Sequence, residues 1–375
     1  MRQILILITA SLALFSCKSN YQGEYKVENR RDIKYPRLVI DTIIVNIGLT
    51  ALEGYSGVHE DYLYYLDQYD CYLYKISLEG EVTEKRFGLG RGPNEIPFPG
   101  TAAAINDNKF LILGSSADHL ISKNYNDKSD AFERIWHSFH KMPEATTLED
   151  ARAYTFFDAV ILRVDNDKLF YNIVGNGSVM EPYEQSETYY KDAHIIMEVD
   201  IFTGDMRPIG KFSQYYIDNH SKFKYLFIPI YDIDKSGNFI VTYQADSLIY
   251  VSDREFSPIK AFGYEGKEMD KNYTPATSDM ESIRRAYTND ILNKEKGYYY
   301  WVKYVNETDM TFRSYKKGGQ ASKDGLQVYN GHTLIADVDI PEDLMVAGYI
   351  PPYYVSQMVF DLENEIMKFY RFKLE

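Results

Sequence analysis

The sequence predicts an all-β protein, and more specifically a six-bladed β-propeller. Short runs rich in Tyr, Leu, Ile and Val recur along the chain, as in "YLYYLDQYDCYLYKISL", and these residues favour strands. Turn pairs such as Gly80-Glu81, Gly204-Asp205 and Gly237-Asn238 separate these runs. The roughly 335 residues after Asp41 would give about 56 residues to each of six blades. Seven blades of about 48 residues each, or a pair of β-sandwiches, are the open alternatives.

The chain begins with a predicted export signal over residues 1–16. Arg2 precedes an apolar run, Ile4 to Phe15, which is too short to span a bilayer. The following "LFSC" resembles a bacterial lipobox, which would make Cys17 the lipid attachment residue of a mature lipoprotein. Several acyl chains on one residue anchor a protein stably, whereas one chain does not.

A flexible tether is expected next, over residues 17–40, because "KSNYQGEYKVENRRDIKYPRLVI" is polar at first and has few core residues. The propeller domain is then expected over residues 41–375.

One helix is expected within the domain, near residues 278–296. In "SDMESIRRAYTNDILNKEKG" the apolar residues recur near helical spacing. Ser278 and Glu281 could form a capping box, and Gly297 is a plausible stop. We expect this helix to pack on the rim of a blade.

The glycine-rich stretch "FGLGRGPNEIPFPG" raises the question of nucleotide binding. No Gly-Lys-Ser or Gly-Lys-Thr follows, and Pro93, Pro97 and Pro99 forbid the helix that a dinucleotide loop requires. The glycines are therefore interpreted as a tight crossing between two blades. Arg91 and Glu95 are expected to tie this junction by polar bonds, with ligand contact as the alternative.

The segment "GLGRGPNEI", the lipobox, the Tyr-rich hairpins and the C-terminal "ENEIMKFYRFKLE" together resemble the TolB-like and NHL-like propeller lipoproteins of Bacteroidota. These are largely families of unknown function. The resemblance implies six blades, an outer-membrane location and a role in binding other envelope proteins. The segment "KSNYQGE" lacks the acidic export tag of some surface lipoproteins, which favours the periplasmic face.

The sequence motifs that would indicate a metal site or a catalytic nucleophile are incomplete. Asp232, Asp234 and Ser236 occupy the first EF-hand positions, but Tyr243 stands where a bidentate Glu is required, so a hairpin turn is the better interpretation. His137 and His140 lack further ligands nearby, and "GNGSV" around Ser178 lacks the nucleophile-elbow form. Cys71 is expected to be a buried small hydrophobe. We therefore predict no catalytic residues, no metal and no cofactor.

The amino-acid composition limits the classes of molecule that the protein is expected to bind. A net charge of −14 disfavours nucleic acid, because binding requires clustered Lys and Arg. The cluster "KGYYYWVKY" offers Tyr299 and Trp301 as candidates for stacking on a glycan. We expect a monomeric, lipid-anchored binding or scaffolding module. A carbohydrate- or small-ligand-binding lipoprotein is the first alternative, and a propeller enzyme (lactonase, lyase or glycosidase) is the second.

Overall fold

The predicted hairpins form, and their strands make up six antiparallel sheets. The computed structural model describes residues 25–47, 53–92, 95–96, 100–106, 109–114, 119–124, 133–136, 147–156, 162–175, 187–222, 224–277 and 279–374. Within these residues three sheets are built only from consecutive strands: β4 (Gly54–His59), β5 (Tyr62–Asp67), β6 (Tyr72–Ile76) and β7 (Val82–Phe87); β8 (Gly100–Asn106), β9 (Lys109–Gly114), β10 (His119–Asn124) and β11 (Glu133–Trp136); and β12 (Tyr154–Phe156), β13 (Arg163–Asp165), β14 (Lys168–Gly175), β15 (Ile196–Asp200) and β16 (Met206–Ile209).

The other three sheets each add one strand from the N-terminal segment. They are β17 (Pro229–Ile233), β18 (Phe239–Tyr243), β19 (Ile249–Ser252) and β20 (Pro258–Phe262) with β1 (Lys26–Val27); β21 (Lys296–Val305), β22 (Met310–Gly318), β23 (Asp324–Asn330) and β24 (Thr333–Ile340) with β2 (Arg30–Arg31); and β25 (Val346–Ile350), β26 (Tyr353–Ser356), β27 (Val359–Asp361) and β28 (Ile366–Phe372) with β3 (Ile40–Val45).

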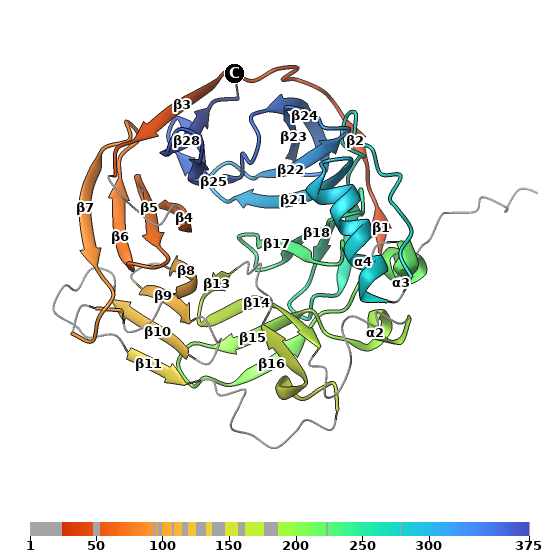
Figure 1. Ribbon diagram of the computed structural model, residues 1–375, viewed down its shortest axis with the longest axis horizontal. Coiled ribbons are helices and arrows are strands. Elements are labelled where there is room, and N and C mark those ends of the chain that lie inside the picture. The colour runs from red at the N-terminus through yellow and green to blue at the C-terminus, as the bar shows by residue number, and fades with distance from the viewer. Residues whose placement is uncertain are drawn as a thin grey trace, which may run out of the picture.

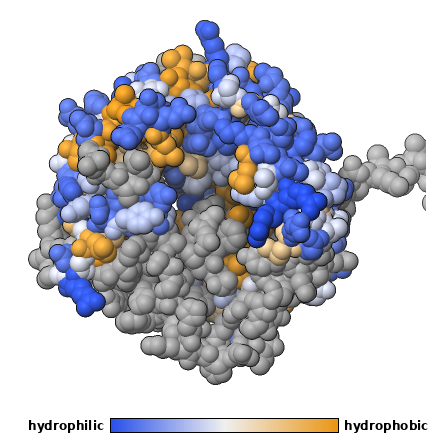
Figure 2. All heavy atoms as spheres, viewed as in Figure 1, coloured by the Kyte–Doolittle hydropathy of each residue, from blue (hydrophilic) through white to orange (hydrophobic). Residues whose placement is uncertain are grey.

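The sheets stand in a ring around a central axis, so the expected all-β propeller is confirmed, in place of a pair of sandwiches (Figure 1). The innermost strands contact one another around the axis in the order β4, β8, β13, β17, β21, β25 and back to β4. Each sheet thus buries both faces against its neighbours, and the core lies between the sheets. Figure 2 shows the face hollowed at the centre of the ring.

Tyrosine can fill this core because the hydroxyl finds a partner inside it. Tyr216 is fully buried. Its hydroxyl donates to the Leu226 carbonyl at 2.6 Å and accepts the Ala245 N–H at 2.8 Å. Cys71 is also buried, as the sequence predicts.

The expected tether over residues 17–40 is wrong from residue 25 onward. β1 pairs in parallel with β20, β2 pairs in parallel with β24, and β3 pairs antiparallel with β28. This segment runs along the outer edge of three successive sheets before the first hairpin begins (Figure 1). The physical reason is that outer strands leave unpaired backbone groups, which a polar segment can satisfy without apolar side chains.

The predicted helix forms, but it is shorter than residues 278–296. An α-helix, α4 (Met280–Tyr287), continues as a π-helix, η3 (Thr288–Leu292). Its N-cap is Asp279, whose carboxylate accepts the Ser282 N–H at 2.8 Å; Ser278 lies outside the described residues. Gly297 is not the stop, because it lies inside β21, where an added Cβ would collide with the Lys316 and Lys317 carbonyls.

The remaining helices are short: η1 (Ala151–Ala153), α2 (Glu187–Asp192), α3 (Gln214–Asn219) and η2 (His220–Lys222). Of the helices in the described part of the chain, none has the length and apolar composition of a membrane-spanning segment.

Candidate functional site

The glycine-rich stretch connects β7 with β8, the innermost strand of the next sheet. The Gly90 N–H donates to the Ile96 carbonyl at 2.9 Å, and the Ile96 N–H donates to the Gly88 carbonyl at 2.8 Å. Gly88 has φ of +141°, a conformation that side chains disfavour. The stretch therefore forms a closed backbone loop between two sheets.

Glu95 and Arg91 have different roles in this loop. The Glu95 carboxylate accepts the Gly92 N–H at 2.7 Å and lies over Gly90, where a Cβ would overlap it. Arg91 is exposed, and no described residue forms an ion pair or hydrogen bond with its side chain. Glu95 thus fastens the junction, whereas Arg91 does not.

Tyr299 and Trp301, the expected glycan-stacking pair, are both buried, contrary to the prediction. Tyr299 is 0% exposed and Trp301 is 8% exposed. The Trp301 indole Nε1 donates to the Val346 carbonyl at 2.8 Å. A β-bulge between Tyr299 and Trp301 interrupts the alternation along β21, because Tyr299 pairs with Tyr315 whereas Trp301 pairs with the adjacent Ser314. The two side chains therefore lie on opposite faces of the sheet: Tyr299 contacts the loop after β20, and Trp301 reaches Val346 of β25.

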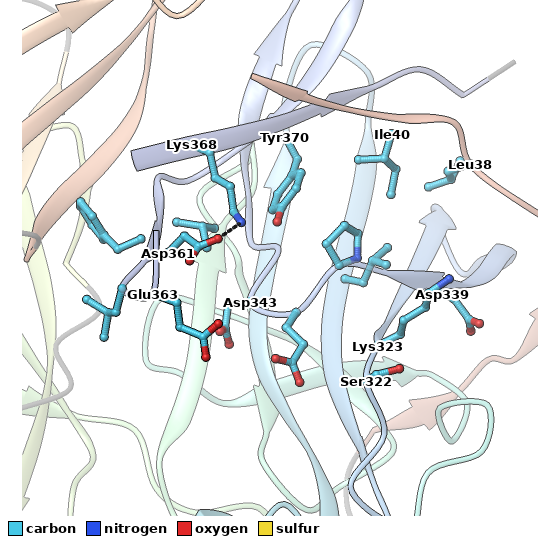
Figure 3. Close-up of a pocket in the computed structure, with 16 residues that line it drawn as sticks. Leu38, Ile40, Ser322, Lys323, Asp339, Asp343, Asp361, Glu363, Lys368 and Tyr370 are labelled. Atoms are coloured by element: carbon cyan, nitrogen blue, oxygen red, sulfur yellow. Dashed lines mark hydrogen bonds and ion pairs between the residues drawn. The ribbon is translucent and has the colours of Figure 1, made fainter. Parts of the chain in front are cut away.

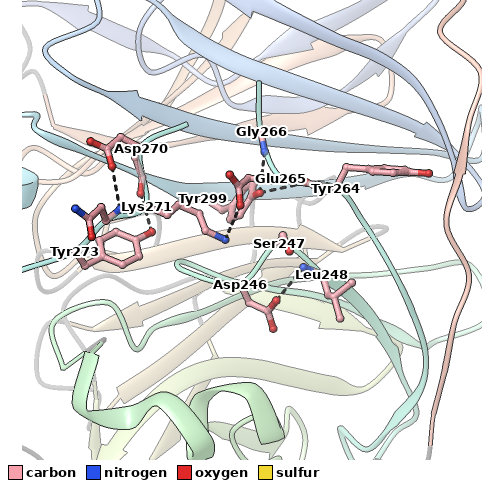
Figure 4. A network of polar contacts seen from close by, with 12 residues as sticks. Asp246, Ser247, Leu248, Tyr264, Glu265, Gly266, Asp270, Lys271, Tyr273 and Tyr299 are labelled. Carbon is pink, nitrogen blue, oxygen red and sulfur yellow. Dashed lines mark hydrogen bonds and ion pairs between the residues drawn. The ribbon is translucent and has the colours of Figure 1, made fainter. Parts of the chain in front are cut away.

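The Tyr299 hydroxyl belongs to a polar network between β18 and β21 (Figure 4). It accepts the Gly266 N–H at 3.1 Å and donates to the Tyr264 carbonyl at 3.2 Å. Nearby, Asp246 accepts the Leu248 N–H at 3.0 Å, and burial raises the pKa of its carboxyl. Because these groups satisfy one another, the network fixes the loop after β20 and leaves Tyr299 unavailable to a ligand.

A second buried cluster lies on innermost strands near the axis. The Asp232 carboxylate of β17 forms ion pairs with Arg163 Nε of β13 at 2.7 Å and with Lys303 Nζ of β21 at 3.0 Å. Burial alone would raise the pKa of Asp232, but Lys303, Arg163 and the Tyr304 N–H together hold it below its ordinary value. Asp232, the first residue of the EF-hand-like pattern, is therefore paired with two cations from other sheets.

Asp234, the next residue of that pattern, caps the β17–β18 turn. Its Oδ1 accepts the Ser236 and Asn238 N–H groups, both at 2.8 Å. The hairpin interpretation of this segment is confirmed.

The candidate functional site is a groove of about 760 Å³ between the β21–β24 and β25–β28 sheets (Figure 3). Its walls come from the turn after β24, from the hairpin joining β27 and β28, and from Leu38 and Ile40 of the N-terminal segment. We call it the β24–β27 groove. Sequence reasoning missed it because its walls come from three distant parts of the chain.

Four of the five carboxylates that line the β24–β27 groove are paired with lysines, and Glu363 is the exception among the described residues. Asp361 lies 3.1 Å from Lys368 Nζ (Figure 3), and hydrogen bonds from the Asn364 side chain and Lys368 lower the pKa of Asp361. The same kind of pairing recurs around the rim: Asp339 with Lys317 at 2.7 Å, Asp343 with Lys316 at 2.8 Å, and Glu342 with Lys294 at 2.8 Å.

The groove also presents apolar surface. Leu362, at the tip of the β27–β28 hairpin, is 71% exposed. Val359, Phe360, Tyr370 and Ile40 line the wall below it. The groove therefore combines apolar surface with charges of both signs.

Other predicted positions cannot be placed. Cys17, His137, His140 and Ser178 lie outside the described residues. Among those that are described, no group of three or more His, Cys, Asp and Glu side chains is arranged to hold a metal ion.

Solved structures share this fold. A DUF4221-family protein from Bacteroides vulgatus is 14% identical, with 90% of this chain and 98% of that chain covered and a TM-score of 0.65. A proposed exported protein from Bacteroides fragilis is 16% identical, with coverage of 93% and 99% and a TM-score of 0.53. No family model matches the sequence, and no curated protein does either. At these identities the likeness establishes a β-propeller fold shared with Bacteroides proteins.

Proposed function

We propose that this protein is a lipid-anchored, six-bladed propeller of the bacterial envelope that binds another envelope protein without catalysing a reaction. Each of the six sheets is taken as one blade. The β24–β27 groove is the proposed binding surface of the protein. Cys17 is the proposed lipid anchor.

The pairing of the groove's carboxylates carries this proposal. A general acid or base must be free to exchange a proton with substrate, and a metal ligand must turn its oxygens to the ion. Asp361, Asp339 and Asp343 are instead held by lysine ammonium groups within 3.1 Å. Such fixed charges give a binding surface its orientation and specificity, which is the role that we assign to them.

A polypeptide fits the groove better than a glycan does. Leu362 and Val359 offer aliphatic contact, and the surrounding charges of both signs can pair with side chains of a partner. The aromatic residues on which the glycan alternative depended, Tyr299 and Trp301, are buried.

A photo-crosslinking amino acid at position 362 tests the binding surface in cells that produce the full-length protein. The control places the same amino acid at Phe202, which is 58% exposed in the turn between β15 and β16. We expect a discrete crosslinked protein from position 362 only, and its loss when Glu363→Lys reverses a charge on the groove. Equal crosslinking from both positions would contradict the assignment of the groove.

The non-catalytic part of the proposal is tested separately. The purified protein should hydrolyse no member of a panel of glycans, lactones and esters. Turnover that scales with protein concentration would replace the binding role with an enzymatic one, and its loss in Glu363→Lys would place the reaction in the groove.

The anchor is tested by Cys17→Ala. We expect loss of palmitate labelling and release of the protein from the membrane fraction, because Cys17 is the cysteine of the lipobox-like "LFSC". Unchanged labelling would show that Cys17 is not the lipidated residue.

A further inference from the structure

The N-terminal segment, where a flexible tether was expected, has a fixed backbone and a positive charge. Its backbone is held firmly to the ring: the Glu28 N–H donates to the Ala261 carbonyl at 2.8 Å, and the Asp32 and Lys34 N–H groups donate to Leu334 and Ile335 at 3.0 and 2.8 Å. Its side chains therefore occupy fixed positions on the outer edge of the ring. We call residues 26–37 the basic strap.

The basic strap is positively charged in an acidic protein. It contains five Lys or Arg residues and two acidic residues, in a chain whose net charge is −14. All five cations are exposed: Lys26, Arg30, Arg31, Lys34 and Arg37. Screening limits the influence of distant charges to about 8 Å at physiological salt, so a ligand at this edge meets the local positive charge.

Few of these cations are neutralised by the protein. Glu28 pairs with Lys26 at 2.7 Å and with His332 at 3.0 Å. In the described part of the chain no carboxylate pairs with Arg30, Lys34 or Arg37. Burial lowers the pKa of His332, and the neighbouring cations Lys260 and Arg30 lower it further against the opposing effect of Glu28.

Apolar side chains are exposed between the cations. Val39 is 78% exposed and Ile259 is 51% exposed, and Val27 and Ile33 are also exposed. Ile259 belongs to β20, which pairs with β1. Basic residues interleaved with exposed aliphatic ones are the composition of surfaces that lie in the interface of a bilayer.

We propose that the basic strap docks on the anionic surface of a lipid bilayer and holds the ring edge-on to the membrane. The proposal rests on the proposed lipid anchor for its setting. Seven residues separate Cys17 from Tyr25, where the chain joins the ring, and the eight steps from Cys17 to Tyr25 span at most about 29 Å. An anchor this short keeps the strap beside the headgroups, and an edge-on ring leaves both of its open faces accessible.

Vesicle binding by the unlipidated chain, residues 18–375, tests the docking surface directly. Every strand in the described part of the ring lies after residue 25, so removal of the signal and Cys17 takes away none of these strands. Binding is measured by co-sedimentation with vesicles of 70% phosphatidylcholine and 30% phosphatidylglycerol at low and physiological salt. Each basic residue near such a surface contributes about fivefold to binding.

We expect the triple variant Arg30→Gln, Lys34→Gln, Arg37→Gln to bind about 100-fold more weakly, with unchanged circular dichroism. The matched control removes three cations from other edges, Lys75→Gln, Lys85→Gln and Lys235→Gln, and should bind within about threefold of wild type. Both should lose binding as salt rises.

Equal binding of the triple variant and the control would overturn the proposal, and so would wild-type binding to pure phosphatidylcholine at the same strength. Because the protein used carries no lipid, these results are independent of whether Cys17 is acylated. A bilayer-dependent blue shift of an environment-sensitive dye on Ile33→Cys, absent for a dye on Tyr69→Cys, would support the edge-on orientation; a shift at both positions would contradict it.

Discussion

Replacing Arg313 with methionine should destabilise the fold far more than the loss of an exposed arginine. Arg313 is fully buried between the β17–β20 and β21–β24 sheets. Its guanidinium donates to Gln327 Oε1 at 2.6 and 3.0 Å, to the Tyr264 carbonyl at 2.7 Å and to the Ser247 carbonyl at 3.0 Å. It also lies 3.9 Å from the centre of the Tyr299 ring. One side chain thus joins two neighbouring sheets.

The loss of unfolding free energy depends on which hydrogen-bond acceptors of Arg313 are left without any donor when it is replaced. The Tyr264 carbonyl keeps the Tyr299 hydroxyl at 3.2 Å and Gln327 Nε2 at 3.1 Å. Gln327 Oε1 keeps the Tyr329 hydroxyl at 3.0 Å. Within the described residues, the Ser247 carbonyl keeps no donor. Ser247 is partly buried, and its carbonyl, once left without a donor, costs up to about 1–3 kcal/mol; the lost cation–π contact adds about 0.5–2 kcal/mol. We therefore expect Arg313→Met to lower the free energy of unfolding by about 1.5–5 kcal/mol.

Urea unfolding, followed by both circular dichroism and tryptophan fluorescence, measures this difference once the two probes report the same midpoint. The control is Arg254→Met, which removes a side chain that is 45% exposed and pairs with Asp165; such a pair contributes about 0–1 kcal/mol. The reasoning is refuted if Arg313→Met unfolds within about 1 kcal/mol of wild type, or at the same midpoint as Arg254→Met.

Three further predictions concern stability. Gly90→Val should cost about 1–2 kcal/mol, because the new side chain displaces the Glu95 carboxylate that accepts the Gly92 N–H. Gly92→Val should cost less and Arg91→Ala least; thermal melts in which both glycine variants match wild type would remove the structural role of this junction. Hydrogen bonds from the Thr203 N–H and Lys168 lower the pKa of Asp200 from 3.8 to about 2. Because the folded-state pKa is the depressed one, the stabilisation is complete above about pH 4 and is lost as pH falls through about 2. Asp200→Asn should therefore be less stable than wild type at pH 7 and lose less stability between pH 4 and 2, whereas parallel curves would contradict the shift. Asp290→Ala removes the buried acceptor of the Thr274 N–H and hydroxyl, both at 2.6 Å. Amide hydrogen exchange over residues 274–292 should become faster while β23 is unaffected, and unchanged exchange in both would argue against this role.

The sequence by itself determined the fold class and the hairpins of the ring. Alternation of Tyr, Leu and Ile predicts strands, and Gly-containing pairs predict the turns, because both signals act between residues that are close in the chain. The same local signals identified the helix that begins at Met280 and the hairpin turn at Asp234. They also excluded a phosphate loop at Gly88 to Gly92, because three prolines follow within a few residues.

Only the tertiary structure decided which residues meet. Asp232 lies between Arg163 and Lys303, which come from two other sheets, and no local pattern couples positions so far apart in the chain. Tyr299 and Trp301 looked available because their neighbours are aromatic, yet the packing of sheets around the ring buries them. Residues 26–37 looked like a tether because they are polar. Their order comes from backbone hydrogen bonds to β20 and β24, which any side chain permits and which composition therefore cannot reveal.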